Sequence, residues 1–230
     1  MLPLGKVTAL SAALAFWGGG AFAQDHKPAG GAGASGHHME HRFDDAERYA
    51  KRFDDPGRDA WQMPARVIET LSIRPGQSVA DVGAGTGYFS VRLAKAAAAP
   101  TVYAVDVERS MVDYVRERAS KEGLKNITPV LAGAASANLP APVDLVLIVD
   151  TYHHIPDRTE YFRALRKSMK PGGRLAIIDF RRDSPEGPPV EFRFTPEQVE
   201  AELAPAGFRV LARHDFLPRQ YFLVLQAGDR

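Results

Sequence analysis

The sequence predicts an α/β domain with one mostly parallel β-sheet and helices on both of its faces. Short apolar runs of strand length alternate with segments of helical periodicity along most of the chain, the pattern of repeated β-α units. Near the C-terminus two strand-like runs follow each other closely, and such a pair is expected to form an antiparallel hairpin. We therefore expect a seven-stranded, mostly parallel sheet with an antiparallel C-terminal strand.

The composition and net charge of the chain indicate which kind of molecule it binds. The chain has 230 residues, of which 45% are hydrophobic and 25% charged, enough apolar material for one full-sized core. A formal net charge of +1 gives no overall field that would attract nucleic acid or an anionic membrane, so a small-molecule partner is expected. The chain has no cysteine, which excludes disulfides, thiolate metal sites and cysteine nucleophiles.

Residues 1–23 have the features of a cleavable signal peptide. Lys6 supplies the positive start, an apolar run extends from Val7 to Phe16, and the segment ends in Ala21-Phe22-Ala23, the pattern that signal peptidase reads. We expect cleavage before Gln24 and export, to the periplasm. The apolar run is short for a membrane span, and no later segment is long enough. The alternatives are an uncleaved interfacial anchor, a frayed N-terminus and a cytoplasmic protein.

Residues 24–42 read QDHKPAGGAGASGHHMEHR and have almost nothing to bury, which indicates a flexible leader. Its histidines could hold copper or zinc loosely, but a flexible tract lacks the surrounding groups that orient metal ligands. We therefore favour a solvated linker and predict no metal site. These histidines are His26, His37, His38 and His41.

Residues 43–230 are expected to form one domain. Two helices come first, at Asp44–Phe53 and Met63–Leu71. The next segments alternate as strand Ser78–Val82, helix Tyr88–Ala96, strand Thr101–Val105, helix Ser110–Glu122, strand Ile127–Leu131, strand Val143–Val149, helix Arg158–Met169 and strand Arg174–Phe180.

The C-terminal part begins with a capped helix. Thr195 is a good N-cap, Pro196 suits the first helical position, and Gln198 can complete a capping box, so a helix should extend to about Ala204. Two further strands are expected, at Phe208–His214 and Tyr221–Gln226. In open α/β sheets, ligands bind at the carboxyl ends of the parallel strands.

The stretch VADVGAGTGYF, residues 79–89, places three glycines directly after the first expected strand. Glycine permits positive φ and lets the backbone approach a ligand, and the following helix N-terminus offers free N–H groups. A dinucleotide-binding turn would need a small residue where Tyr88 stands, which disfavours an oxidoreductase using NAD. The turn therefore indicates a different nucleotide-like ligand.

With its D-x-G-x-G-x-G spacing the turn resembles the first motif of the class I S-adenosylmethionine-dependent methyltransferases. The resemblance covers most of residues 61–226, through AVDVERSM, VDLVLIVDTYHHI and MKPGGRLAIIDF in the right order. It implies a Rossmann-like fold and S-adenosylmethionine as cofactor. It further implies that the backbone of Gly83, Ala84, Gly85 and Gly87 faces the methionine part of the cofactor.

Side-chain roles follow from the same resemblance. Asp81 should help to bind the cofactor's ammonium group, and Asp106 should accept hydrogen bonds from both ribose hydroxyls. Val107 and Met111 should flank the adenine. The competing interpretations are a helix cap for Asp81, a turn residue for Asp106 and ordinary core for the two apolar side chains.

The chain departs from the family at one position. Many relatives carry an acidic residue after the third strand to accept from the adenine amino group, whereas this chain reads LAGAASANLP there. Ala134, Ala135 and Ser136 offer no carboxylate, so adenine recognition must come from backbone or from Ser136.

The segment after the fourth strand is expected to face the methyl acceptor. Asp150 is counted among the cofactor-binding residues, His153 and His154 are candidate acceptor-side catalytic residues, and Tyr152 is a candidate hydrogen-bond donor. The alternative is that one histidine caps the next helix and the other is a satisfied interior residue. Trp61 and Gln62 could close over the cofactor as part of an N-terminal lid, or be core.

Three functions stay open. The first is methyl transfer to a small molecule, because the TYHHI wording looks like methyltransferases of ubiquinone biosynthesis. The second is a protein carboxyl methyltransferase of the isoaspartyl type, whose glycine turn shares the GTGY wording. The third is an exported binding module without turnover, since S-adenosylmethionine is made in the cytoplasm. Arsenite methyltransferases, which hold arsenic by cysteine thiolates, are disfavoured by the lack of cysteine.

Overall fold

A computed structural model describes residues 45–133 and 135–228 of the protein. The chain divides into two units, 1–34 and 35–230, and all described residues belong to the second. The expected signal peptide and histidine-containing leader lie outside the described residues and stay predictions. No helix within the two described ranges is both long and apolar enough to cross a membrane.

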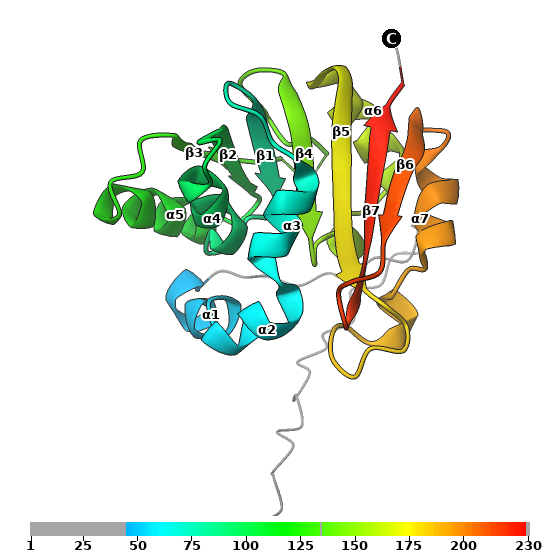
Figure 1. The fold of residues 1–230 in the computed structure, drawn as a ribbon, viewed down its shortest axis with the longest axis horizontal. Helices are drawn as coiled ribbons and strands as arrows, with labels where there is room; N and C mark the ends of the chain where they lie inside the picture. Colours follow the sequence, from blue (N-terminus) through cyan, green and yellow to red (C-terminus); the bar gives the residue numbers. More distant parts are fainter. Residues whose placement is uncertain (1–44, 134, 229–230) are drawn as a thin grey trace, which may run out of the picture. The chain divides into compact units, whose positions relative to one another are not determined.

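The fold is built on one seven-stranded sheet with the order β3-β2-β1-β4-β5-β7-β6 (Figure 1). Its strand β7 runs antiparallel to both of its neighbours, and all other neighbouring strands are parallel. This confirms the predicted sheet, with β7 inserted between β5 and the edge strand β6. The strands are β1 Ser78–Val82, β2 Thr101–Asp106, β3 Ile127–Leu131, β4 Val143–Val149, β5 Met169–Phe180, β6 Phe208–His214 and β7 Gln220–Ala227.

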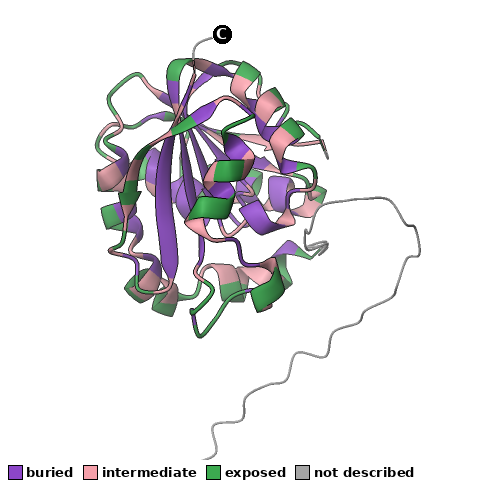
Figure 2. Ribbon diagram, turned by 90° about the vertical axis from the view of Figure 1, so that its right-hand side faces the viewer, coloured by how far each residue is buried: buried purple, intermediate pink, exposed green. Residues whose placement is uncertain are grey.

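Helices cover both faces of the sheet, as predicted. Side chains of α3, α4 and α5 pack with one core cluster, and side chains of α6 and α7 pack with the other. Strands β1, β4 and β7 are mostly buried, the edge strands β3 and β6 carry exposed positions, and Figure 2 shows further exposed positions on the helices. The helices are α1 Ala46–Phe53, α2 Asp59–Gln62, α3 Pro64–Leu71, α4 Tyr88–Lys95, α5 Arg109–Lys121, α6 Arg158–Lys167 and α7 Pro196–Leu203.

Local sequence signals explain most helix ends. The side chain of Asp45 accepts a hydrogen bond from the Arg48 N–H, which sets the start of α1. Thr195 and Gln198 form the predicted capping box at the start of α7. The largest difference from prediction is β5, which begins at Met169, five residues before the expected Arg174. There Met169 already pairs with Val143, and a register shift accommodates the intervening Pro-Gly-Gly turn.

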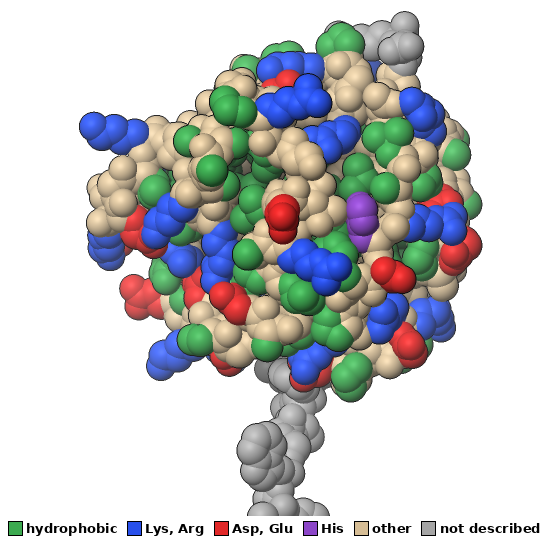
Figure 3. Space-filling view, in the orientation of Figure 1, with side chains coloured by type: hydrophobic (Ala, Val, Ile, Leu, Met, Phe, Trp, Pro, Cys, Tyr) green, Lys and Arg blue, Asp and Glu red, His purple; other side chains and the backbone are tan. Residues whose placement is uncertain are grey.

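Short elements that the periodicity did not predict lie at the carboxyl end of the sheet. The 3₁₀ turn η1, Pro56–Arg58, leads into α2, and Figure 1 places α1 and α2 beside the carboxyl ends of the parallel strands. A second 3₁₀ turn, η2, Tyr152–His154, follows β4, and a third, η3, Val190–Phe192, follows β5. Over the described residues visible in Figure 3, Lys and Arg are interspersed with Asp and Glu, in keeping with the near-zero net charge.

Candidate cofactor and acceptor site

The glycine turn is fastened to the neighbouring strand by its own backbone. The N–H groups of Gly83 and Ala84 both donate to the carbonyl oxygen of Val105, at 2.8 and 3.0 Å. Gly83, Gly85 and Gly87 have φ values of 77°, 54° and 84°, which residues with a side chain rarely adopt. The turn thus brings consecutive backbone groups to the carboxyl ends of β1 and β2, where the resemblance places the cofactor.

Gly83 also leaves no room for a side chain. A Cβ atom there would lie 2.2 Å from the Thr151 Oγ1 atom, whereas a Cβ at Gly76, with a similar φ of 81°, would meet nothing within 4 Å. We expect Gly76→Ala to lower the free energy of unfolding by about 1–2 kcal/mol through backbone strain alone. Gly83→Ala should lower it by about 1–3 kcal/mol more through overpacking. Equal losses for the two variants in urea denaturation would contradict this packing.

Asp106, at the predicted ribose position, connects the glycine turn to the loop that follows β2. Its Oδ2 atom accepts from the Gly85 N–H at 2.8 Å and its Oδ1 atom from the Glu108 N–H at 3.0 Å. Burial raises the pKa of the carboxyl group, and the two backbone hydrogen bonds oppose that rise. A carboxylate offers about four acceptor positions, so each oxygen can still accept one hydroxyl. The geometry therefore fits a vicinal diol.

Asp81 is committed to the protein interior. Its side chain is among the buried polar groups, with the residue 3% exposed, and its Oδ2 atom accepts from the Ser90 hydroxyl at 2.6 Å. Burial raises the pKa of the carboxyl group to about 6, although the Ser90 hydrogen bond lowers it. In this structure Asp81 links β1 to α4, so its predicted contact with a cofactor ammonium group stays a prediction.

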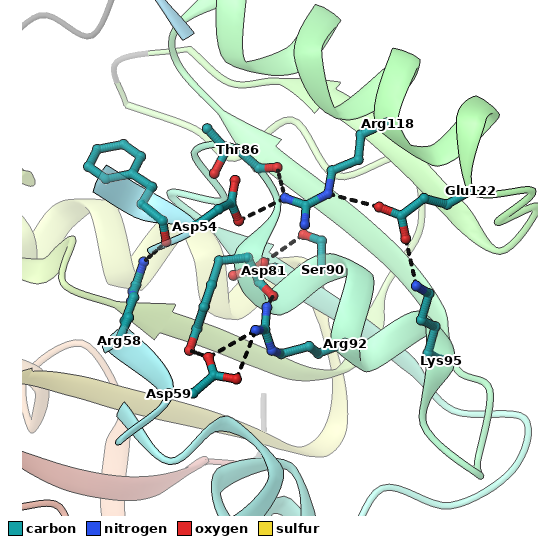
Figure 4. Close-up of polar contacts among 12 residues, drawn as sticks. Asp54, Arg58, Asp59, Asp81, Thr86, Ser90, Arg92, Lys95, Arg118 and Glu122 are labelled. Carbon is teal, nitrogen blue, oxygen red and sulfur yellow. Dashed lines mark hydrogen bonds and ion pairs between the residues drawn. The ribbon is translucent and has the colours of Figure 1, made fainter. Parts of the chain in front are cut away.

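The N-terminal segment packs directly on the glycine turn. The Phe53 ring lies 3.3 Å from the position that a Cβ of Gly85 would take. Arg118 bridges the two parts, since it donates to the Asp54 carboxylate at 2.8 Å and to the Thr86 carbonyl oxygen at 2.9 Å (Figure 4). Phe53 and Asp54 therefore lie against the glycine turn, and the lid role of Trp61 and Gln62 stays a prediction.

Residues on the expected adenine side differ in their exposure. Val107 is 61% exposed, whereas Met111 is 1% exposed. Ser136 is exposed, and its hydroxyl accepts from the Asn138 N–H at 3.1 Å. Ala134 lies outside the described residues. The exposed Val107 next to Asp106 fits an apolar ring, and Met111 fits a floor beneath it or ordinary core.

A closed ring of hydrogen bonds connects the N-terminal segment to the ends of β4 and β7. Arg58 donates to the Gln62 side-chain oxygen at 3.2 and 3.1 Å, and Gln62 donates to the Gln220 side-chain oxygen at 2.6 Å. Gln220 donates to Asp150, which also pairs with Arg58 at 3.3 Å. We call these four residues the Arg58 ring. Both glutamines are fully buried.

Asp150 belongs to this ring and has an uncommon backbone. Its φ is 53°, a conformation that costs energy for a residue with a side chain and is frequent at functional sites. Burial raises the pKa of its carboxyl group to about 7, against the lowering effect of Arg58. The predicted cofactor-binding residue therefore lies at the end of β4 next to β1, close to the glycine turn.

His153 forms a buried pair with Asp179 at the end of β5. The His153 Nδ1 atom lies 2.9 Å from Asp179 Oδ2, and both residues are nearly inaccessible, at 3% and 4% exposure. Burial lowers the pKa of the imidazole, but the charge and hydrogen bond of Asp179 outweigh it, so the pKa is raised. The His154 ring lies 4.2 Å from the His153 ring, centroid to centroid.

Tyr152, the first residue of η2, contacts α7 instead of Asp179. It is fully buried, stacks on Phe162, and donates its hydroxyl hydrogen to Glu202 at 2.6 Å. Glu202 also pairs with Arg158. Because its hydroxyl is committed to Glu202, Tyr152 braces η2 against α7 in this structure, and its predicted contact with an acceptor stays a prediction.

The structure brings some of the predicted residues together and adds several that were missed. The glycine turn, Asp106 and Asp150 converge, and His153 follows Asp150 closely. Trp61 packs by its ring on Phe180, with the centroids 5.7 Å apart. The missed residues are Arg58, Asp179 and Gln220. Of these only Asp179 had a readable signal, because it nearly ends an apolar strand, as Asp106 does in its own strand.

Comparison with known proteins agrees with the fold and site. A family model described as a methyltransferase domain matches residues 79–173. A solved S-adenosylmethionine-dependent methyltransferase from Aquifex aeolicus superposes with a TM-score of 0.72 at 29% identity, over 79% of this chain and 98% of that one.

Two curated relatives match in sequence. The ubiquinone/menaquinone biosynthesis C-methyltransferase UbiE of Burkholderia mallei is 33% identical over 128 residues, 54% of this chain and 50% of that protein. The protein-L-isoaspartate O-methyltransferase of Methylorubrum populi is 32% identical over 156 residues, 65% of this chain and 66% of that protein. The chain spans about half the length of the curated relatives that it matches.

The sheet order, with a glycine turn at the carboxyl ends of the parallel strands, agrees with the fold of the solved methyltransferase from Aquifex aeolicus. A methyltransferase domain thus spans residues 79–173, and the fold and the relatives support a class I S-adenosylmethionine-dependent methyltransferase, which implies S-adenosylmethionine as the cofactor. The residues present fit that group. Asp106 has acceptor capacity for a diol, Val107 exposes an apolar surface beside it, and the buried hydroxyl of Thr86 in the turn has no partner among the described residues.

Proposed function

We propose that the protein transfers a methyl group to a small-molecule acceptor that carries an ionisable proton on oxygen or nitrogen. The observation that carries this proposal is the His153–Asp179 pair at the ends of β4 and β5, beside Asp150. Bound S-adenosylmethionine supplies an electrophilic methyl group on a sulfonium. The protein's residues must then position the acceptor and receive its proton.

His153 is suited to receive that proton. Asp179 accepts from Nδ1, which leaves Nε2 as the basic nitrogen of the neutral ring. The bound cofactor would supply the methyl group to the acceptor atom, and the proton that this atom loses would pass to Nε2 of His153. His153 is 3% exposed in this structure, so acceptor binding requires neighbouring side chains to move. His154, which is less buried, is proposed to line the path to it.

A protein carboxyl methyltransferase is a second candidate, favoured by the similarity to the isoaspartate enzyme of M. populi. The two candidates differ in their need for a base. A carboxylate acceptor is already ionised near neutral pH, so its methylation releases no proton to His153. Methylation of a phenol or an amine does release a proton, which His153 can accept.

Transfer from methyl-labelled cofactor to a panel of phenols, enols and amines, and to isoaspartyl peptides, tests the proposal. We expect label in one of the small molecules, and loss of that transfer when His153 is replaced by glutamine. Transfer only to the isoaspartyl peptides, independent of His153, would support the second candidate. No transfer to any acceptor by a protein that binds the cofactor would support the third function, a binding module.

We also propose that residues 1–23 direct export and are cleaved, that residues 24–42 form a leader, and that residues 43–230 form the methyltransferase domain. The n-region, apolar run and Ala-Phe-Ala ending support this division. Mass spectrometry of the protein isolated from its own cells should find a mature N-terminus at Gln24. A chain that retains residues 1–23 in the cytoplasmic fraction would refute export.

A further inference from the structure

Arg58 lies between the glycine turn and the segment that follows β4. Its guanidinium stacks on the Tyr88 ring, with 4.1 Å between the Cζ atom and the ring centroid, and its side chain is 14% exposed. Tyr88 follows the glycine turn directly, while Asp150, the partner of Arg58, directly follows β4. Arg58 also donates to the carbonyl oxygen of Phe53, whose ring covers Gly85. The cation is therefore held between the glycine turn and the acceptor side.

Electrostatics agree with this position. Burial raises the pKa of both Asp81 and Asp150, and the positive charge of Arg58 lowers each of them in part. One guanidinium thus acts on the carboxylates at the ends of β1 and β4. Cofactor atoms near the glycine turn would come under the same charge.

The neighbouring arginines are neutralised more closely than Arg58 is. Arg92 donates to both oxygens of Asp59, at 2.9 and 3.2 Å (Figure 4). Arg118 reaches Asp54 at 2.8 Å and Glu122 at 3.1 Å. These guanidinium groups have short contacts to carboxylates, as structural ion pairs usually do.

Arg58 is oriented instead by neutral oxygens. Three of its hydrogen bonds go to the Phe53 carbonyl and to the Gln62 amide oxygen, at 3.0, 3.2 and 3.1 Å. Its ion pair within residues 45–133 and 135–228 is one contact of 3.3 Å, to an Asp150 oxygen atom. Gln220 shares that carboxylate. A guanidinium fixed by neutral groups keeps much of its charge available for another anion.

We propose that Arg58 binds the α-carboxylate of the methionine part of the cofactor. The planar guanidinium fork matches a carboxylate in shape and charge, and the contact to Asp150 is the one that this carboxylate would replace. Gln62 accepts two hydrogen bonds from the fork, and Gln220 in turn accepts one from Gln62. The proposal rests on the cofactor assignment and adds a residue that binds the carboxylate at the methionine end of that cofactor.

Calorimetric titration with S-adenosylmethionine and with decarboxylated S-adenosylmethionine tests this, because the second probe lacks only that carboxylate. The wild-type protein should bind the first probe about 10- to 100-fold more tightly, the effect of a charge-assisted hydrogen bond. Arg58→Gln should abolish most of this preference. Arg58→Lys, which keeps the charge and loses the fork, should give an intermediate ratio.

Arg92→Gln is the matched control. Arg92 stacks on the same Tyr88 ring, at 3.8 Å, but is paired with Asp59. Its variant should keep the wild-type ratio. The proposal is overturned if folded Arg58→Gln protein, checked by thermal unfolding, keeps the preference, or if Arg92→Gln loses it equally. Wild-type protein that binds neither probe would instead refute the cofactor assignment, and with it this inference.

Discussion

Replacing Asp106 by alanine should weaken binding of S-adenosylmethionine by at least about 100-fold. Two ribose hydroxyls would each lose a hydrogen bond to a charged group, together about 3–6 kcal/mol. The variant also frees the N–H of Gly85, which Asp106 holds at 2.8 Å in the turn. Both effects reduce affinity, so this substitution should have the largest effect on cofactor binding.

Two further variants separate recognition from folding. Asp106→Asn keeps an oxygen that can accept from Gly85 but loses the charge, and it should bind with intermediate affinity. Asp113→Ala removes a half-exposed carboxylate of α5 that pairs with Arg116, and it should bind like the wild type. Dissociation constants from calorimetry decide the matter. Folded Asp106→Ala protein with an affinity within about threefold of wild type would contradict the assigned role.

Replacing His153 by glutamine should lower kcat by roughly 100- to 10,000-fold once an acceptor is known, the usual contribution of a general base. The dissociation constant for the cofactor should change little, since Asp106 and the glycine turn are untouched. Asp179→Asn is the companion variant, because it keeps the side-chain volume at that position and removes the negative charge beside His153. An unchanged kcat for His153→Gln would refute the proposed base.

The pH dependence of kcat has a definite sign. His153 must be neutral to accept a proton, so kcat should fall as pH decreases through the folded-state pKa of the imidazole. Asp179 holds that pKa above its ordinary value. Asp179→Asn should therefore move the acidic limb of the profile to lower pH, besides lowering kcat. A limb that stays in place would show that another group controls it.

Short-range signals in the sequence were sufficient for the sheet and the cofactor edge. Alternating strand and helix periods predicted the seven strands and the glycine spacing predicted the turn, while the resemblance to the methyltransferases singled out Asp106. Both depend on residues near each other in the chain, or at the ends of adjacent parallel strands. The structure places Gly85 and Asp106 in contact across 21 residues, as that logic requires.

The rest depends on contacts between distant segments. Gln62 and Gln220 are 158 residues apart, and nothing in either local sequence indicates that two amides are buried together. Arg58 lies in a short Pro-Gly segment with no periodicity to interpret. In the η2 turn Tyr152 contacts Glu202, while His153 contacts Asp179. The sequence offered no signal that the two neighbouring side chains have different partners.

The most direct test of the account is calorimetric titration of the purified wild-type protein with S-adenosylmethionine. We predict saturable binding of one cofactor per chain in the micromolar range, together with binding of the demethylated product at the same site. A folded protein that gives no binding of either compound would contradict the central claim that the glycine turn and Asp106 hold this cofactor.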